Sequence, residues 1–353
     1  MRILVINPGS TSTRVALFED EVCVHTERLA HDAEELEKAG SLWGQFELRK
    51  AVVLGFLAQN GIDLASLDAV VGRGGLLKPL PGGTYLVNEA MIEDARKGLQ
   101  GEHVSNLGCA LAKAIADEAG CPAYVVDPVS VDEFEPLARY SGHPRIERRA
   151  LSHSLSIHAV ARRAAQQLGL RYELAHFVVA HLGGGISVAP VRGGRIIDVN
   201  DASSDGPFSP ERTGGLPLQP FITLCYSGEF REDEMRRFVM GKGGLVAYLG
   251  TNNAVEVERR ILQDGDLRAR EVYEAMAYQI AKEIGAMATV LKGQVDAIVL
   301  TGGLASSDML CTWIAERVSF IARVLRYPGE FEMEAMAEGA LRVLRGEEQA
   351  LSY

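Results

Sequence analysis

The chain has 353 residues, of which 47% are hydrophobic and 24% are charged. This length exceeds one ordinary core and predicts two domains, and the composition is typical of a soluble globular protein. The formal net charge of −11 argues against nucleic acid as the main partner, because no surplus of basic side chains is available to release counterions. An anionic substrate therefore has to be held by local cationic side chains, backbone N–H groups or metal.

The cysteine pattern and the apolar segments bear on location. The chain has 5 cysteines, an odd number, and none of them form a C-x-x-C pair. This usage is typical of reduced thiols in the cytoplasm. The apolar run at 3–6 is too short for a signal peptide, and no apolar run approaches the length of a membrane span. We therefore expect a cytoplasmic protein with no membrane partner.

Taken in chain order, apolar segments of strand length alternate with segments of helical pattern. The helical segments end at glycine, which helix C-termini prefer. This alternation predicts an α/β fold. The expected strands are 3–6, 15–18, 69–72, 123–126, 177–180, 186–191 and 297–300, and the expected helices are 104–120, 154–169, 267–293 and 334–344.

An approximate internal repeat is the most informative feature of this order. The chain opens with the pattern ILVI–NPGSTST–RVALF, and near residue 177 it reads FVVA–HLGGG–ISVAPV followed by RIIDV. Each unit predicts a β-hairpin with glycine at the first bend. A duplicated α/β domain built this way would place the two bends opposite each other across a cleft. The charged, irregular segment 128–152 is then the crossover between the lobes.

The first bend, residues 7–14, has the residue types of a phosphate-binding turn. Its small residues let the backbone approach a phosphate, and the hydroxyls of Ser10 and Ser12 are donors. An ordinary hairpin uses the same residue types, so this turn alone leaves both interpretations open. The chain contains no G-x-x-x-x-G-K-[ST] loop.

Two further glycine turns follow strands. Three consecutive glycines inside an apolar strand pair weaken the sheet, so close approach of a phosphate explains them better. His181 at the strand end either donates to a transferring phosphoryl group or is an ordinary strand-end histidine. A Gly-Gly pair directly after the strand 297–300 suits contact with a nucleoside. The expected phosphate-binding glycines are Gly183, Gly184 and Gly185, and the expected nucleoside-binding ones are Gly302 and Gly303.

Two strand–glycine turn–strand units followed by a strand–Gly-Gly turn resemble the superfamily of actin, sugar kinases and heat-shock chaperone ATPases. The segments INPGSTST, VGRGGLL, PGGTYLV, GEHVSNLG, AYVVDPVSVDE, VVAHLGGGIS, DGPFSPERTGGLPL, GGLVAYLGT and IVLTGGLA resemble the acetate and butyrate kinase family, and within it the butyrate branch, collinearly over essentially the whole chain. The resemblance implies two ribonuclease-H-like domains of the actin-like ATPase type with a central interdomain cleft. The first would span 1–150, completed by a helix at about 333–353, and the nucleotide-binding second would span 151–332.

The resemblance also implies an activity: reversible, Mg²⁺-dependent transfer of a phosphoryl group from ATP to the carboxylate of butyrate or a similar short-chain or branched acid. An anionic nucleophile must approach an anionic phosphate, so catalysis consists of positioning and charge neutralisation. A carboxylate is already deprotonated at neutral pH, so no general base is needed. Acetate or propionate stays open as the acceptor, and an ATP-driven actin- or chaperone-like binding protein is the alternative in another class. The resemblance suggests a homodimer or larger homo-oligomer.

Two arginines are the candidates for neutralising this charge. Arg73 lies at a strand end between glycines, and Arg212 lies in a Pro/Gly-rich loop. Both match arginines that the family uses near the carboxylate and the γ-phosphate. The alternative is that each is a surface arginine, or that Arg212 pairs with Glu211.

Histidines supply the remaining catalytic candidates. His153 and His181 match family histidines near the transferring phosphoryl group, and His103 matches a third on the substrate side. His158 lies one helical turn beyond His153, where a metal pair is formally possible. No third ligand is evident, so we expect His158 to be a helix-surface residue.

The resemblance assigns the metal to oxygen ligands, which Mg²⁺ prefers. Asp127 ends a buried strand, where a carboxylate points into a cleft, and Glu332 is the second matched acid, although the local sequence permits a register slip to Glu334. Asn7 matches an asparagine that contacts phosphate or metal-bound water. Arg14 either assists with phosphate or is an exposed strand residue.

Two assignments concern specificity. Relatives often carry Asp at the position of Asn253, which is expected to contact the nucleoside; an amide keeps hydrogen bonding but loses the charge, so the nucleotide preference stays open. Leu76, Leu77 and Val87 near the expected carboxylate site suit a short alkyl tail. Each buried methylene contributes about 0.8 kcal/mol, which favours butyrate over acetate. The alternative is that these residues only fill the core.

Overall fold

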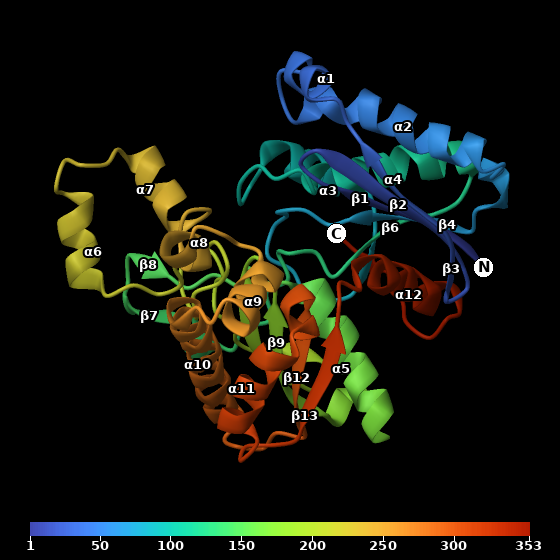
Figure 1. Ribbon diagram of the computed structural model, residues 1–353. Coiled ribbons are helices and arrows are strands. Elements are labelled where there is room, and N and C mark those ends of the chain that lie inside the picture. Colours follow the sequence, from blue (N-terminus) through green and yellow to red (C-terminus); the bar gives the residue numbers. More distant parts are fainter. The chain divides into compact units, whose positions relative to one another are not determined.

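The computed structural model describes all residues from Met1 to Tyr353. The chain folds into two compact units, drawn as ribbons in Figure 1. Unit 1 comprises Met1–Asp132 and Phe331–Tyr353, and unit 2 comprises Glu133–Glu330. The C-terminal segment thus belongs to the same unit as the N-terminus.

The boundary after residue 132 differs from the division expected after residue 150. The carboxylate of Glu133 accepts a hydrogen bond from the Ile196 N–H at 2.7 Å, and the Glu135 N–H donates to the Ile197 carbonyl at 3.0 Å. These bonds attach the segment that follows Asp132 to the sheet of unit 2. They connect residues about 60 positions apart, so local sequence pattern does not reveal them.

Unit 1 is built around a seven-stranded sheet. Its strands are β1 (Arg2–Pro8), β2 (Ser12–Glu19), β3 (Val22–Ala30), β4 (Ala69–Arg73), β5 (Thr84–Leu86), β6 (Ala123–Val126) and β14 (Leu351–Ser352). Their spatial order is β14-β5-β6-β4-β1-β2-β3. β1, β2 and β3 form an antiparallel meander, whereas β4 runs parallel to β1 and β6 runs parallel to β4.

Helices cover both faces of this sheet. In Figure 1, α2, α3 and α4 lie together on one side of it, and α12 lies on the other. The core beneath the first group is formed by apolar side chains of β1, β2, α2 and α4, all of them nearly inaccessible to solvent. The helices of unit 1 are α1 (Ala33–Lys38), α2 (Phe46–Gln59), α3 (Glu89–Lys97), α4 (Asn106–Ala119) and α12 (Glu332–Leu344).

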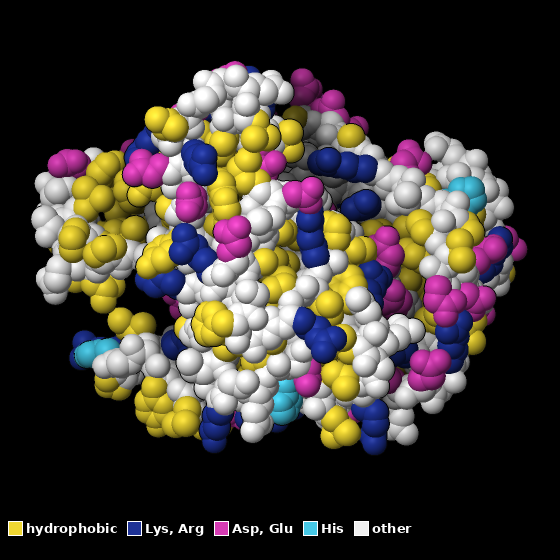
Figure 2. All heavy atoms as spheres, turned by 60° about the horizontal axis from the view of Figure 1, so that its bottom comes forward, with side chains coloured by type: hydrophobic (Ala, Val, Ile, Leu, Met, Phe, Trp, Pro, Cys, Tyr) yellow, Lys and Arg dark blue, Asp and Glu magenta, His cyan; other side chains and the backbone are white.

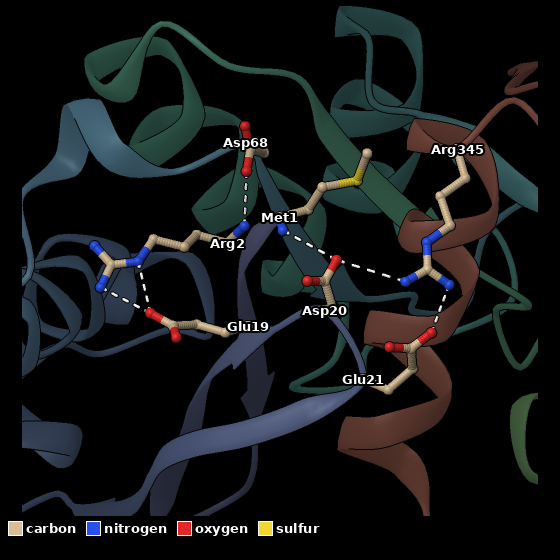
Figure 3. Close-up of polar contacts among 7 residues, drawn as sticks. All are labelled: Met1, Arg2, Glu19, Asp20, Glu21, Asp68 and Arg345. Atoms are coloured by element: carbon tan, nitrogen blue, oxygen red, sulfur yellow. Dashed lines mark hydrogen bonds and ion pairs between the residues drawn. The ribbon is translucent and has the colours of Figure 1, made fainter.

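Charged contacts tie the end of α12 to the start of the chain (Figure 3). Arg345 contacts Glu21 at 2.5 Å and Asp20 at 3.5 Å, and Asp20 also accepts a hydrogen bond from the Met1 ammonium group at 3.0 Å. The ammonium hydrogen bond lowers the pKa of Asp20, and the Arg345 hydrogen bond lowers the pKa of Glu21. These pairs are exposed and contribute little stability individually. They indicate where α12 ends against the β2–β3 turn.

Unit 2 contains a five-stranded sheet, formed by β9 (His176–Leu182), β10 (Ile186–Arg192), β11 (Arg195–Ile196), β12 (Ala297–Gly302) and β13 (Val324–Pro328). Their spatial order is β11-β10-β9-β12-β13. β9 and β10 pair antiparallel, whereas β9, β12 and β13 run parallel. Five strands of unit 1 have the same order and directions, with β3, β2, β1, β4 and β6 in the corresponding places. The internal repeat expected from the sequence is therefore confirmed.

Helices pack against the unit 2 sheet, and among them α10 contributes the most side chains to the core. The helices are α5 (Ser154–Leu168), α6 (Leu218–Cys225), α7 (Glu232–Val239), α8 (Gly244–Leu249), α9 (Ala254–Gln263), α10 (Leu267–Val290) and α11 (Asp308–Val318). A separate hairpin consists of β7 (Tyr140–His143) and β8 (Ile146–Glu147). Short 3₁₀ turns occupy Trp43–Gln45, Leu64–Ser66, Pro136–Arg139, Tyr172–Leu174 and Gly303–Ser306.

All seven expected strands and all four expected helices are present. The structure adds β3, a long strand with almost every side chain exposed, so its sequence lacks the apolar alternation that identifies a half-buried strand. It also adds the β7–β8 hairpin within a segment expected to be irregular, and it shortens the third strand of the second repeat to two residues.

Surface character agrees with the composition. On the face drawn in Figure 2, Lys and Arg side chains are interspersed with Asp and Glu side chains. This face therefore presents mixed charge rather than one continuous basic surface, as a net charge of −11 favours. No helix of the chain combines the length and the apolar character that a membrane crossing requires.

Candidate active site

The first glycine turn is the bend of the β1–β2 hairpin in unit 1. The Gly9 N–H donates to the Ser12 carbonyl at 2.7 Å, which closes the bend. Ser10 and Thr11 at its tip are exposed, and their N–H groups make no hydrogen bond within the chain. Two free neighbouring N–H groups in a turn of small residues are suited to an anion. The geometry therefore permits a phosphate here, although the turn is also a hairpin.

Polar side chains line up beside this turn on one face of the sheet. Asn7 pairs with Arg14 across β1–β2, and Arg14 pairs with Arg28 across β2–β3, so the three side chains share a face. Arg28 also donates to the Ser12 hydroxyl at 3.0 Å. Two like charges directly opposite each other destabilise a strand pair unless an anion lies near. Arg28 was not identified from the sequence, because β3 itself was not.

Arg73, the last residue of β4, is only 6% exposed. Its Nη2 lies 3.3 Å from one carboxylate oxygen of Glu332, and the other oxygen accepts a hydrogen bond from the Asn7 amide at 2.8 Å. Nη1 of Arg73 is buried and has no partner in the chain. Leaving a buried donor unsatisfied costs about 1–3 kcal/mol. The arrangement thus joins three of the expected site residues and offers a donor to a ligand oxygen.

The glycine before Arg73 has a packing role. A Cβ on Gly72 would lie 2.0 Å from the Gly108 carbonyl, and a Cβ on Gly108 would lie 2.2 Å from the Arg73 carbonyl. β4 and α4 therefore meet backbone to backbone at this point. This close approach explains the Gly72 position without a ligand, so the case for Arg73 depends on its buried Nη1.

Asp127 follows β6 directly and is held in an uncommon backbone conformation, with φ of 38°. Its N–H donates to the Gly83 carbonyl at 3.0 Å, and its carboxylate accepts from the Gly83 N–H at 2.7 Å. The side chain is almost fully buried. A backbone constraint of this kind costs free energy and is often found at functional sites.

The acids of unit 1 fit a magnesium ion whose other ligands are phosphate oxygens and water. Asp127 and Glu332 are hard oxygen donors, and Glu332, the first residue of α12, is the acid that contacts Arg73 and Asn7. The chain has no group of three His, Cys, Asp or Glu side chains arranged around a metal. Mg²⁺ commonly binds through one or two carboxylates, with phosphate oxygens and water completing the shell. The residues present meet that requirement and no larger one.

The expected substrate-side residues differ in burial. His103 is exposed, and its Nδ1 bonds with the Ser105 hydroxyl at 2.7 Å. Desolvation by the surrounding chain and, second, the positive charge of Arg73 lower the pKa of His103. Leu76 is half-buried, whereas Leu77 and Val87 belong to the core of unit 1.

The second glycine turn, in unit 2, brings two expected histidines together. His181 lies opposite Ser187 in the β9–β10 hairpin that Gly183–Gly185 connects. His153, directly before α5, bonds through Nδ1 to the Ser187 hydroxyl at 2.9 Å. Its ring stacks on that of His181, with centroids 4.0 Å apart and planes at 11°. Two imidazoles next to a glycine turn can donate hydrogen bonds to a phosphate and, when protonated, neutralise part of its negative charge.

Arg212 lies against the same turn. A Cβ on Gly185 would be 2.4 Å from its Nη1, so only glycine leaves room for the guanidinium at that position. Nη1 donates to the Ala202 carbonyl at 3.2 Å. Glu211 does not pair with Arg212 and instead accepts a hydrogen bond from Asn252 at 3.4 Å. The alternative of an Arg212–Glu211 pair is therefore wrong, and the Arg212 charge has no carboxylate partner.

Ser209 connects the Arg212 loop to the glycine turn. Its buried hydroxyl donates to the Gly184 carbonyl at 2.5 Å and accepts from the Arg212 N–H at 3.2 Å. Ser209 was not identifiable from the sequence, because a serine in a Pro/Gly-rich loop carries no local signal of a bond to a residue 25 positions away.

The third glycine turn follows β12. Gly302 has φ of 92°, and a Cβ there would lie 2.4 Å from the Leu182 carbonyl at the end of β9. Gly303 has open space where its Cβ would be. The two glycines thus differ: Gly302 is required by backbone packing, and Gly303 leaves room beside the strand end.

Asn253 is the N-cap of α9. Its side-chain oxygen accepts hydrogen bonds from the N–H groups of Val255 at 3.0 Å and Glu256 at 3.4 Å. Aspartate caps helices about equally well. Its exposed amide NH₂ is the group left to contact a ligand, so the exchange of Asp for Asn changes a charge without changing the cap.

His158 is not the helix-surface residue expected from the sequence. It is buried, its Nδ1 bonds with the Tyr172 hydroxyl at 2.9 Å, and its Nε2 lies 3.6 Å from the Glu133 carboxylate. The reason is that residues 154–161 of α5 are all buried, so this part of the helix has no solvent face.

A half-buried acidic residue, Asp205, lies in the loop that leads to Arg212. Burial raises the pKa of Asp205 to about 6, with Arg148 opposing the shift and Asp201 adding to it. Burial, and then the charge of Asp205, also raises the pKa of Glu283. One Asp205 oxygen is buried without a partner. The Asp205 carboxyl therefore keeps its proton to a higher pH than an ordinary aspartate does.

Comparison with known proteins places this geometry in context. Residues 140–320 match the model of the Acetokinase family. The chain is 53% identical over 352 residues to "Probable butyrate kinase 2" of Caldanaerobacter subterraneus subsp. tengcongensis, covering 100% of this chain and 99% of that protein. It is 51% identical over 353 residues to "Butyrate kinase 2" of Clostridium acetobutylicum, again covering 100% and 99%.

Solved structures share the fold at low sequence identity. Porphyromonas gingivalis acetate kinase superposes with a TM-score of 0.82 at 18% identity, covering 97% of this chain and 99% of that one. A propionate kinase from Francisella tularensis subsp. tularensis gives 0.76 at 18% identity, with coverages of 96% and 98%. Acetate kinase from Entamoeba histolytica gives 0.76 at 14% identity, with the same coverages. The expected α/β fold with two ribonuclease-H-like domains is confirmed.

Proposed function

Because the chain belongs to the acetokinase family, we propose that it is a butyrate kinase. It transfers the γ-phosphoryl group of ATP reversibly to the carboxylate of butyrate or a similar short-chain or branched acid. The assignment of butyrate is supported by relatives named butyrate kinase at 51–53% identity over the whole chain. The observation in the site that carries the proposal is the buried, unsatisfied Nη1 of Arg73, a donor suited to an anion.

In this proposal, residues of unit 1 hold the acid and part of the nucleotide. Nη1 of Arg73 donates to the substrate carboxylate or the transferred phosphoryl group, while Glu332 holds the other side of the guanidinium. Desolvation and the charge of Arg73 lower the pKa of His103, which favours its neutral form beside the substrate. Ser10 and Ser12 and the free N–H groups of the first turn contact ATP phosphates, with Arg14 beside them.

Residues of unit 2 hold the transferring group and the nucleoside. Arg212 and the stacked pair His153 and His181 stabilise the charge on the transferring phosphoryl oxygens. Such positioned charges account for most catalysis in phosphoryl transfer, where little covalent chemistry falls to the protein. The phosphates lie along Gly183, Gly184 and Gly185, and the nucleoside contacts Gly302, Gly303 and Asn253.

The metal belongs to the same proposal. When bound, Mg²⁺ neutralises charge on the phosphate oxygens. Asp127 and Glu332 hold it, directly or through water, and Asn7 orients Glu332 through its amide. The rigid turn at Asp127 keeps that carboxylate in place before the nucleotide arrives.

Chain length of the acid depends on the apolar wall. Leu76 is half-buried and is proposed to contact the alkyl tail, whereas Leu77 and Val87 act from the core. Each methylene removed from water contributes about 0.8 kcal/mol.

We also propose a cytoplasmic homodimer or larger homo-oligomer. The cytoplasmic location is in keeping with cysteines that are all free thiols.

Trapping of the acyl phosphate with hydroxylamine tests the function. The protein with Mg-ATP should yield hydroxamate from acetate, propionate, butyrate and isobutyrate, with the highest kcat/KM for butyrate. A maximum at acetate or propionate would move the assignment to those acceptors. ATP hydrolysis without any hydroxamate would favour an ATP-driven binding protein.

A further inference from the structure

Behind the first glycine turn lies a fully buried arginine. Arg49 of α2 has no solvent-exposed surface. Its Nη1 donates to the Ser12 carbonyl at 3.2 Å and the Thr13 hydroxyl at 3.0 Å, and its Nη2 donates to the Ser10 carbonyl at 3.3 Å. Nε and Nη2 also donate to the Gln45 side-chain oxygen at 3.1 and 2.9 Å. The guanidinium is thus bonded throughout, and two of its partners are carbonyls of the turn.

None of these partners carries a negative charge. Burial lowers the pKa of Arg49, and no acidic residue offsets this effect. An ion withdrawn from water into protein without a counter-ion is costly, even when it is hydrogen-bonded. An apolar side chain of similar volume would avoid that cost. The position therefore holds a positive charge whose balancing anion is not part of the chain.

The contact with Ser10 also determines which way the turn presents its N–H groups. In a trans peptide, the carbonyl and the following N–H point to opposite sides. Because the Ser10 carbonyl faces Arg49, the Thr11 N–H is directed away from it, toward the exposed side of the turn. That N–H makes no bond within the chain. Arg49 thus binds carbonyl oxygens of the turn, and the Thr11 N–H remains directed outward.

We infer that Arg49 is a positioning residue for the phosphates of ATP, and that a phosphate on the outer side of the turn balances its charge. The inference rests on the proposed function in one respect, namely that this turn binds nucleotide phosphate. Arg49 does not touch the ligand; it orients the turn and adds a positive potential behind it. Both effects act on ATP and not on the acid.

Gln45 allows the charge to be separated from the geometry. Gln45→Glu keeps the acceptor for Nε and Nη2 but places a carboxylate against the guanidinium. The affinity for Mg-ATP, measured by calorimetry without acid, should fall by about tenfold. This is the size expected for unit charges roughly 10 Å apart at an effective dielectric of about 20. The unfolding temperature should stay the same or rise, because the buried charge gains a partner. KM for butyrate should not change.

Three controls complete the design. Gln45→Met removes the same acceptor without adding charge and should bind Mg-ATP nearly as tightly as the wild type. Ala51→Glu adds the same charge on the exposed face of α2 and should leave the Kd unchanged. Arg49→Met removes the charge and the carbonyl contacts together and should weaken Mg-ATP more than Gln45→Glu does.

The outcomes discriminate between explanations. Unchanged Mg-ATP affinity in Gln45→Glu would overturn the inference, and so would equal losses in Gln45→Glu and Gln45→Met, because the acceptor rather than the charge would then matter. If the wild type binds Mg-ATP but forms no hydroxamate from any acid, the proposed function fails, while the ratio of Kd values still decides the role of Arg49. Failure of the wild type to bind Mg-ATP would overturn both.

Discussion

At the scale of single residues, Arg73 differs from the surface arginines of the chain. Arg236, for example, pairs with Glu232 on the exposed face of α7, where an ion pair contributes little. Arg73 is buried, holds Glu332 with one nitrogen and leaves the other unsatisfied. A group that is costly for folding and unused by the fold is a strong candidate for ligand binding.

Replacement of this arginine gives the first prediction. Arg73→Ala should lower kcat for hydroxamate formation by roughly 10³-fold or more, as for arginines that stabilise a transferring phosphoryl group, and Arg212→Ala should act in the same direction. Circular dichroism should show that both variants remain folded. Arg96→Ala is the matched control, since Arg96 lies over the Trp43 ring on the same unit. Near-normal turnover in either catalytic variant would exclude the role assigned to that arginine.

Asp205 leads to a prediction of pH dependence. Its pKa of about 6 in the folded protein is above its unfolded value, so the folded state binds the proton more tightly. The contribution to stability is complete below the unfolded pKa of about 3.9 and is lost as pH rises through about 6. The unfolding free energy of the wild type should therefore decrease between pH 5 and pH 7. This window extends roughly one pH unit on either side of that pKa.

Asp205→Asn should flatten this part of the profile, because an amide resembles the protonated acid and does not titrate. Thermal unfolding of both proteins at several pH values is the measurement. Asp117→Asn, which removes an exposed carboxylate of α4, is the control. It should show the same decrease in unfolding free energy between pH 5 and pH 7 as the wild type. An Asp205→Asn profile parallel to that of the wild type would contradict the assignment.

At the scale of elements, α12 determines whether Glu332 reaches Arg73 and Asn7. The helix packs against β1, β4 and β6, and it lies close to the sheet at Gly339. A Cβ there would lie 2.5 Å from Val126 and 3.1 Å from the Thr84 hydroxyl, which already bonds to the Gly339 carbonyl. The absence of a side chain at this position lets the helix lie close to the sheet.

Two alanine substitutions in helices should therefore have opposite effects. Gly339→Ala forces overpacking and should destabilise the protein by about 1–3 kcal/mol, moving Glu332 and lowering activity as well. Gly55→Ala in α2 meets no atom within 4 Å and should stabilise by about 0.5–1 kcal/mol. Denaturant unfolding measures both. A stabilised Gly339→Ala variant would show that α12 has room to move.

At the scale of the whole molecule, one segment of unit 2 exposes a cluster of apolar side chains. Leu137, Tyr140 and Ile146 lie at and beside the β7–β8 hairpin and are 66–84% exposed. Clustered exposed apolar side chains commonly mark a contact surface between proteins. They support the proposal of a homo-oligomer and suggest the hairpin as part of its interface.

Sedimentation velocity tests this proposal. The wild type should sediment as a species of at least twice the 38.2 kDa mass of the chain. Tyr140→Glu should shift the population toward monomer, because a charge buried in an interface is costly. Leu267→Glu, at another exposed apolar residue of unit 2, is the matched control and should not. A monomeric wild type would refute the oligomer.

The sequence by itself determined the glycine turns, the repeated hairpins and part of the helices and strands. Hydrophobic periodicity and helix-ending glycines are local signals, and they correctly indicated seven of the strands, four of the helices and the repeated hairpins. The glycine turns and the family resemblance rest on contiguous residues. The turns and the resemblance could therefore be identified without knowing which residues distant in the sequence are in contact.

Only the tertiary structure decided the contacts around those turns. Arg49 behind the first turn, Ser209 across the second and the pairing of Glu332 with Arg73 each join residues 25 or more positions apart. His158 was misjudged for the same reason, since its burial depends on what packs around α5. Sequence patterns report the period of one element, whereas burial and partnership depend on how several elements pack. That is why the chemistry of single side chains became visible only in the folded chain.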